Sequence, residues 1–172
     1  MRQLNRGTSL IESLAATLLL SIGVLGAAQL HLRTQAHAQV SQAEVLATLL
    51  ATDLGERIRA NPSEDAATSP YNLLAPFATA RQPRALADVA CDTPQRACTH
   101  QQMAMQDLQQ WQQALSRHLG EAAAFVQVQS GHVDIWVGWR PALPPAGTQA
   151  VGCPEAFQAP PGIQCLHLQT AR

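Results

Sequence analysis

The feature that most constrains this chain is an uncharged apolar segment close to its N-terminus. The segment Ser13–Leu32 contains no Asp, Glu, Lys or Arg. Its length of roughly 20 residues is enough for a helix to cross a hydrocarbon core of about 30 Å. The preceding residues, Met1–Gly7, carry Arg2 and Arg6, and basic flanks of this kind stay on the cytoplasmic side of a membrane. We therefore expect one membrane span, with the rest of the chain exported.

One acidic residue, Glu12, stands at the start of this apolar segment. A carboxylate inside a bilayer costs about 2.5–3.5 kcal/mol on insertion scales, so such a residue normally has a partner. Cleavage after Gly7 would give Thr8 a free amino group four residues before Glu12, on the same helix face. We expect this ammonium group to neutralise Glu12, within one chain or between neighbouring chains of a helix bundle. The alternative is a shallow Glu12 whose side chain reaches the membrane interface.

Two simpler interpretations of the N-terminus explain less. An ordinary secretory signal has a shorter apolar region followed by a small-residue cleavage site. Here Gly7 precedes the apolar segment, and only Ala27 and Ala28, before Gln29, resemble such a site. A plain signal anchor accounts for the apolar segment but gives no reason for Glu12. The sequence therefore favours a short leader, residues 1–7, that ends at Gly7.

The periodicity predicts one helix from about Ser9 to Ala60, with residues 8–30 in the membrane and residues 31–60 amphipathic. Asn61 and Pro62 end it, because Pro disfavours helix at the residue before it. Residues 61–98 show little periodicity and are expected to form a connecting loop. The amphipathic part has one apolar stripe, spaced by three or four residues: Ala43, Leu46, Leu50, Leu54 and Ile58.

Residues 99–172 are expected to form a globular part with a helix and an antiparallel sheet. Thr99 can cap a helix over His100–Leu119, and Gly120 can end it. A hairpin is predicted from Phe125–Gln129 and Val133–Trp139, which alternate on either side of a Ser-Gly turn. A third strand is predicted over Gln164–Thr170. Together these elements predict an α+β fold.

The four cysteines all follow the apolar segment, so they lie on one side of a membrane. They are Cys91, Cys98, Cys153 and Cys165. An even number in loop-like surroundings fits two disulfides in an oxidising compartment. We favour the bridges Cys91–Cys98 and Cys153–Cys165, although three pairings remain open.

Motifs for catalysis or metal binding are missing from the sequence. It has no Ser/His/Asp motif, no Gly-rich phosphate loop and no paired carboxylates on a helix face, so we expect no catalytic residue and no enzyme. A zinc site formed by Cys98, His100, Cys165 and His167 lacks the C-x2-C spacing that such sites usually show, so no metal or cofactor is expected. The formal net charge of -1 gives no general electrostatic case for nucleic acid.

The N-terminal residues resemble a known signature. The letters GTSLIE at residues 7–12, followed by SLAA, look like the prepilin signature, in which a dedicated peptidase cuts after Gly and methylates the new N-terminus. The resemblance implies cleavage between Gly7 and Thr8, N-methylation of Thr8, where major pilins usually carry Phe, and an assembly salt bridge for Glu12. Further positions resemble the PilV-type minor pilins: Arg59, Asn61, Pro62, Tyr71, Cys98, Asp107, Trp111 and Leu115.

This resemblance implies a type IV pilin-like fold and a structural function. The chain would be a minor type IV pilin that helps prime pilus assembly or forms part of the pilus tip. It would wait in the bacterial inner membrane, with its C-terminal part in the periplasm, and then join the pilus on the cell surface. The implied partners are other minor pilins, the major pilin, the prepilin peptidase, the inner-membrane assembly platform and, before assembly, membrane lipid.

Two further functions share parts of this pattern. A minor pseudopilin of a type II secretion system carries the same N-terminal signature, so residues 7–12 do not separate the two. A tip adhesin or DNA-binding pilin would need clustered Arg with exposed aromatic residues. The loose group of Arg81, Arg84 and Arg96 is the candidate for such a cluster.

Overall fold

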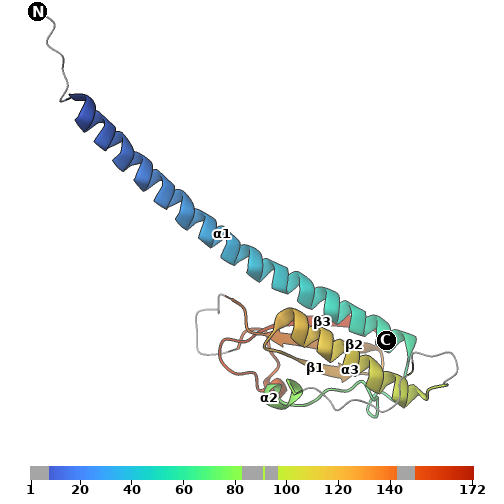
Figure 1. The fold of residues 1–172 in the computed structure, drawn as a ribbon. Coiled ribbons are helices and arrows are strands. Elements are labelled where there is room, and N and C mark those ends of the chain that lie inside the picture. The colour runs from blue at the N-terminus through green and yellow to red at the C-terminus, as the bar shows by residue number, and fades with distance from the viewer. Residues whose placement is uncertain (1–7, 83–90, 92–96, 143–149) are drawn as a thin grey trace, which may run out of the picture. The chain divides into compact units, whose positions relative to one another are not determined.

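The fold is α+β in the computed structural model, which describes residues 8–82, 91, 97–142 and 150–172. The leader 1–7 lies outside the described residues, as do parts of the predicted connecting loop. The chain divides into two compact units, Met1–Gln39 and Val40–Arg172, which we describe separately. Helix α1 (Thr8–Ala60) contributes residues to both units (Figure 1). The predicted long N-terminal helix is therefore confirmed, with its end at Ala60.

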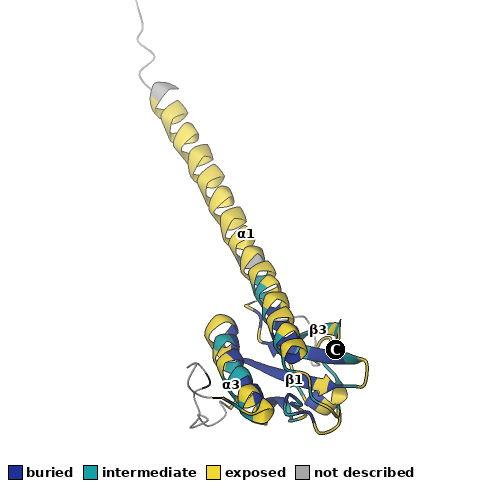
Figure 2. Ribbon diagram, turned by 90° about the vertical axis from the view of Figure 1, so that its right-hand side faces the viewer, coloured by how far each residue is buried: buried dark blue, intermediate teal, exposed yellow. Residues whose placement is uncertain are grey.

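The first unit is an exposed apolar helix. Between Leu10 and Gln35 every side chain is exposed, including all the large apolar ones (Figure 2). Leu19 and Leu20, for example, are each 69% exposed. The helix contains a stretch long and apolar enough to cross a membrane by length and composition, and that stretch is 0% buried.

The second unit is built on a three-stranded antiparallel sheet in the order β1-β2-β3. Strand β1 (Ala122–Val128) pairs with β2 (His132–Trp139), and β2 pairs with β3 (Gln164–Ala171). The predicted hairpin and third strand are confirmed. Strand β1 begins at Ala122, earlier than the predicted Phe125. A run of three Ala shows no alternation in the sequence, but all three are buried and pair with the end of β2.

One face of the sheet is covered by the second half of α1 and by α3 (His100–Leu119), which together form the main core (Figure 1). The predicted stripe on α1 faces this core, and Leu54 and Ile58 are its buried members. Ala47 and Ala51 lie on the same face and are 0% exposed, because small residues let the helix approach the sheet closely. Helix α3 contributes its predicted apolar face: Ala104, Leu108, Trp111, Leu115 and Leu119.

The ends of α3 follow the local chemistry expected from the sequence. The Thr99 side chain accepts a hydrogen bond from the Gln102 backbone, and the Gln102 side chain accepts one from the Thr99 backbone. This capping box satisfies backbone donors that the first helical turn leaves unpaired. At the other end Gly120 adopts a φ of 67°, a conformation that glycine tolerates without steric cost.

The opposite face of the sheet carries a second, smaller apolar cluster. Its buried members are Phe77, Ala123, Phe125, Phe157 and Ile163. Phe77 belongs to the short helix α2 (Phe77–Ala80), and Phe157 to the 3-10 turn η1 (Glu155–Phe157). Helix α2 and the segment 150–163 therefore contribute the residues that pack on this face. Within the predicted connecting loop 61–98 the structure places the short helix α2 and a bridge between Leu73 and Val126.

Candidate functional site

The first candidate site is the start of α1. Gly7 lies outside the described residues, and Thr8 is the first residue of the helix. Glu12 is exposed, among exposed apolar neighbours that include Ile11 and Leu14. Within the described part of the chain Glu12 has no hydrogen-bond or ion-pair partner. The helix therefore presents one carboxylate on an otherwise apolar surface, which is costly in lipid unless a partner neutralises it.

Three hydroxyl side chains that follow Glu12 on α1 bond to the helix itself. Ser13 donates to the Leu10 carbonyl at 2.9 Å, Thr17 donates to the Leu14 carbonyl at 2.9 Å, and Ser21 donates to the Thr17 carbonyl at 2.7 Å. Bonding of this kind hides hydroxyl groups from an apolar environment. Glu12 differs from these three residues, because it has no such local bond among the described residues.

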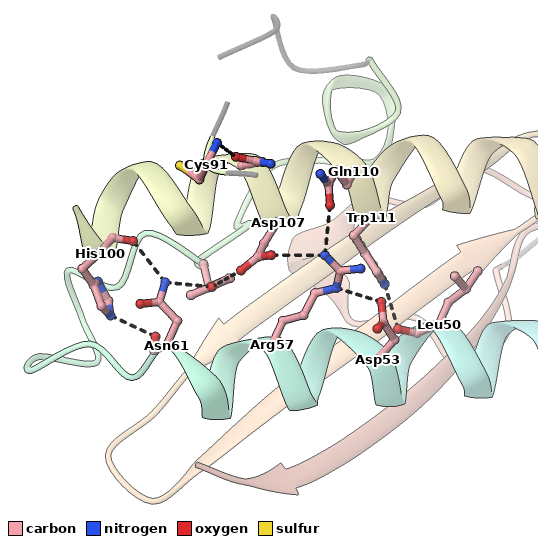
Figure 3. Close-up of polar contacts among 11 residues, drawn as sticks. Leu50, Asp53, Arg57, Asn61, Cys91, His100, Asp107, Gln110 and Trp111 are labelled. Atoms are coloured by element: carbon pink, nitrogen blue, oxygen red, sulfur yellow. Dashed lines mark hydrogen bonds and ion pairs between the residues drawn. The ribbon is translucent and has the colours of Figure 1, made fainter. Parts of the chain in front are cut away.

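The second candidate site is a polar network that joins α1, the following loop and α3, which we call the Asp107 network (Figure 3). The Tyr71 hydroxyl donates to the Asp107 carboxylate at 2.6 Å, and the Arg57 guanidinium donates to the same carboxylate at 3.1 Å. Arg57 also donates to Asp53 at 2.9 Å, one turn earlier on α1. Asn61 donates to the Tyr71 hydroxyl at 3.0 Å. The two helices are therefore bridged by a chain of charge-assisted bonds.

Two members of the Asp107 network, Tyr71 and Arg57, have raised pKa values. Burial, followed by the hydrogen bond to Asp107, raises the pKa of the Tyr71 hydroxyl, so it stays a donor. Burial of Arg57 lowers its pKa, but the hydrogen bonds and charges of Asp53 and Asp107 outweigh this effect. The pKa of Arg57 is therefore raised. Tyr71 is 0% exposed, and its hydroxyl bonds to Asp107 and Asn61.

Three contacts to backbone carbonyls extend the connection between α1 and α3. The Trp111 indole N–H donates to the Leu50 carbonyl at 2.7 Å, and Asn61 donates to the His100 carbonyl at 3.1 Å. The His100 ring in turn bonds to the Asn61 carbonyl at 2.9 Å. Trp111 is 1% exposed, as expected for a core residue. These contacts hold the last turns of α1 against α3. Their role is to position the two helices.

The four cysteines form the two favoured disulfides. Cys91 is bonded to Cys98 with an S–S distance of 1.99 Å, and Cys153 to Cys165 with 2.03 Å. The first tethers the end of the loop next to the start of α3, and the second closes the loop that carries η1. A bridge over loops of this size stabilises a fold by about 2–4 kcal/mol, by a mechanism that depends on the model. The cysteines considered as zinc ligands are therefore oxidised.

A polar cluster on the sheet was missed by the sequence analysis. The Asp134 carboxylate, 5% exposed, accepts from the Gln129 amide at 3.1 Å and the Gln169 amide at 3.2 Å. The rings of His132 and His167 contact it at 3.2 and 2.8 Å. An Asp inside a strand pattern is the signal that could have shown it, because Asp is depleted in strands. The partners come from β2, β3 and the turn, so their meeting depends on strand register.

Of the basic residues considered as a nucleic-acid site, Arg81 lies within the described residues. Arg81 pairs with Glu121 at 2.9 Å, and Arg140 pairs with the same carboxylate at 2.6 Å. The hydrogen bond from Arg140 is the main cause that lowers the pKa of Glu121. Arg84 and Arg96 lie outside the described residues. Among the described residues no group of three or more His, Cys, Asp or Glu is arranged to hold a metal ion.

No protein-family model, curated protein or solved structure matches the chain. Its function is therefore inferred from its own residues.

Proposed function

We propose that this protein is a minor type IV pilin of the PilV kind, made as a prepilin and processed after Gly7. The observation that carries the proposal is the start of α1, where an exposed apolar helix bears one unpartnered carboxylate, Glu12. The α+β unit that follows, with its two disulfides, suits an exported domain. The PilV assignment itself rests on the resemblance of the sequence.

The proposed role of Glu12 follows from the energetics of a carboxylate in lipid. Its cost of about 2.5–3.5 kcal/mol falls when a cation lies beside it. Cleavage after Gly7 creates an ammonium group on Thr8, at the first residue of α1 and one helical turn from Glu12. In a bundle of such helices the carboxylate of one subunit can also form an ion pair with the N-terminal ammonium group of its neighbour. The pair then sets the register between subunits during assembly.

The proposed life of the protein has two stages. The prepilin is anchored in the bacterial inner membrane by its apolar helix, with the N-terminus in the cytoplasm and the globular unit in the periplasm. The prepilin peptidase removes the leader and methylates Thr8. The subunit then joins other minor pilins, and with them the major pilin, at the assembly platform. The Asp107 network supports this role, because a subunit drawn out of a membrane by its domain needs a firm connection between that domain and α1.

The first experiment tests the processing site. Substitution of Gly7 by a bulky residue is expected to leave an uncleaved precursor in the membrane, which mass spectrometry of the N-terminus detects. Gly26→Ala is the matched control, since a Cβ at Gly26 meets nothing within 4 Å. The control should be cleaved as in the wild type. Normal processing of the Gly7 variant would refute the signal assignment.

The second experiment tests the pairing of Glu12. Glu12→Leu is expected to insert normally into the membrane but to be depleted from sheared filaments. Ser13→Ala is the matched control, because the Ser13 hydroxyl bonds only to its own helix. Undiminished incorporation of Glu12→Leu shows that the pairing argument is wrong. Recovery of the chain with a type II secretion pseudopilus instead of pili identifies the alternative machine.

A further inference from the structure

A buried carboxylate on β2, that of Asp134, has histidines as its ion-pair partners. Asp134 is 5% exposed. Its oxygens accept hydrogen bonds from the amides of Gln129 and Gln169, which are neutral. Its ion-pair contacts within the described residues are with the Nε2 atoms of His167, at 2.8 Å, and His132, at 3.2 Å. A buried Asp normally has a partner of opposite charge, because an isolated charge in a protein interior is poorly solvated.

The elements around Asp134 bring no permanent cation to it in the part of the chain that the structure describes. Its neighbours across the sheet are Gln127 on β1 and Gln169 on β3. Arg172, which follows β3, donates to a serine hydroxyl instead. Helices α1 and α3 pack on the opposite face of the sheet, and α2 has no titratable residue. Glu155 on η1 is exposed and forms no ion pair with this group of described residues.

The charge of Asp134 is therefore balanced only when one of the two histidine rings is protonated. A histidine ring ordinarily titrates near pH 6.5 and an aspartic acid near pH 4. Between these values the carboxylate is charged while an imidazole can bind a proton. A hydrogen bond between two charged groups is stronger than one from a neutral donor. Mild acid thus converts a polar contact into an ion pair.

Of the two rings, His167 is better placed than His132 to carry this proton. Its contact with Asp134 is a hydrogen bond of 2.8 Å. Its ring also stacks on Trp136, with the ring centroids 4.3 Å apart and the planes 9° apart. A cation within about 6 Å of the centre of an indole ring is attracted to the face of that ring. Protonation of one histidine also disfavours protonation of the other, because both contact the same carboxylate.

The contacts of His167 join two strands of the sheet. His167 belongs to β3, whereas Asp134 and Trp136 belong to β2, and Trp136 pairs with His167 across the two strands. Strand β3 is the last in the sheet order and has β2 as its only neighbour among the described strands. A stronger bond between His167 and Asp134 therefore holds β3 more firmly on the sheet.

We propose that His167, Asp134 and Trp136 form a pH-sensitive lock between β2 and β3, which tightens when His167 is protonated in mildly acidic surroundings. The His167 side chain is 42% exposed, so protons reach it without unfolding. The added stability is present below the pH at which the unfolded ring titrates, and it is lost as pH rises through the titration of the folded ring. The inference does not rest on the proposed function, because the contacts lie wholly within the globular unit.

Hydrogen exchange of the full chain in detergent, at about pH 5.5 and about pH 8, tests the proposal. The rates of the peptide that contains residues 164–172 are divided by those of an unstructured peptide at the same pH, which gives a protection factor. We expect the protection of β3 to rise roughly fivefold from the higher to the lower pH, the scale by which a hydrogen bond to a charged group exceeds a neutral one. The protection of α3, on the other face of the sheet, should change less.

Three variants separate the charge from the shape of the side chains. His167→Gln keeps a side-chain donor for Asp134 but cannot take up a proton, so its β3 protection should show no rise. Asp134→Asn keeps the size of the side chain without its charge, and it should lose the rise as well. His118→Gln is the matched control, because His118 is an exposed histidine on α3, and it should keep the rise. Near-ultraviolet circular dichroism at the higher pH shows whether each variant is folded, and Asp134→Asn decides if His167→Gln is not.

Tryptophan fluorescence reports the protonation of His167 directly. A protonated imidazole in contact with an indole ring quenches the emission of that ring. Trp136 has such a contact with His167, whereas Trp111 and Trp139 are each 1% exposed and belong to the apolar core. Emission of the wild-type chain should therefore fall between the higher and the lower pH, and that of His167→Gln should stay constant.

Three results overturn the proposal. An equal rise of β3 protection in His167→Gln and wild type shows that another group responds to pH. Quenching of Trp136 without a rise in protection shows that protonation of His167 does not tighten the sheet. A rise that persists in Asp134→Asn shows that the buried carboxylate is not the partner of the charged ring. A wild-type chain that shows both changes but fails to enter pili refutes the proposed function alone.

Discussion

Removal of the Asp107 carboxylate is the sharpest test of how α1 is held on the globular unit. Asp107→Ala takes away the acceptor of the buried Tyr71 hydroxyl and one of the two carboxylates that bond to Arg57. The side chain of Asp107 is 17% exposed and that of Arg57 is 30% exposed, so water replaces the lost bonds only in part.

The expected magnitude follows from these contacts. A buried hydroxyl left without an acceptor costs about 1–3 kcal/mol, and a hydrogen bond to a charged group contributes about 1.5–3 kcal/mol. Since Arg57 keeps Asp53 and some access to water, we expect a total loss of about 2–4 kcal/mol for Asp107→Ala. For a chain of this length that corresponds to a melting temperature lower by about 5–15 °C.

The matched control uses the other carboxylate on the same guanidinium. Asp53 is 49% exposed and contacts Arg57 at 2.9 Å, one turn away on α1. An exposed pair of this kind contributes about 0–1 kcal/mol, so Asp53→Ala should lower the melting temperature little. Asp107→Asn should fall between the two, because its amide oxygen still accepts from Tyr71 while the charge opposite Arg57 is lost.

The assay is thermal unfolding of the full chain in detergent, followed by near-ultraviolet circular dichroism. This signal reports the packing of Trp111 in the core, whereas far-ultraviolet circular dichroism would be dominated by the apolar helix. A Tyr71→Phe variant, combined with Asp107→Asn, gives the coupling between the two side chains. If Asp53→Ala and Asp107→Ala lower the melting temperature equally, the reasoning about burial is refuted.

Further substitutions test the sheet and the surface by the same measurement. Gly138→Ala places a Cβ 2.9 Å from the Phe157 ring, and we expect a loss of about 1–3 kcal/mol from overpacking. Asp134→Ala leaves its four donors without their shared acceptor and should cost about 1–3 kcal/mol, whereas a neutral melting temperature would show that water replaces it fully. Because Arg140 lowers the pKa of Glu121, this carboxylate stabilises the fold above its unfolded-state pKa and loses that effect as pH falls through its folded-state pKa. Glu121→Gln should therefore reduce the loss of melting temperature between neutral and acid pH, and an unchanged acid dependence would contradict this.

Most elements of the fold were predictable because they depend on patterns of residues that are close together in the sequence. Helix α3 lies between the predicted Thr99 and Gly120, since a capping box and a glycine stop act within a few residues. The hairpin was found from alternation about a Ser-Gly turn. The predicted start of β1, Phe125, lies after its actual start at Ala122. Consecutive Ala residues show neither a strand preference nor an alternating pattern. Helix α2 was missed because its four residues are fixed by burial of Phe77 against the sheet.

The sequence by itself determined the apolar helix, the position of Glu12 within it, and the cysteines that form the disulfides. Each depends on composition or spacing along the chain. Only the tertiary structure decided the partners of Asp107, which meets Arg57 and Tyr71 across separations of 50 and 36 residues. It also decided that Leu73 pairs with Val126 and Val151 with Gln164, because these bridges depend on where the chain returns to the sheet before α3 and before β3. Contacts of that kind are set by strand register and helix packing, which no local pattern specifies.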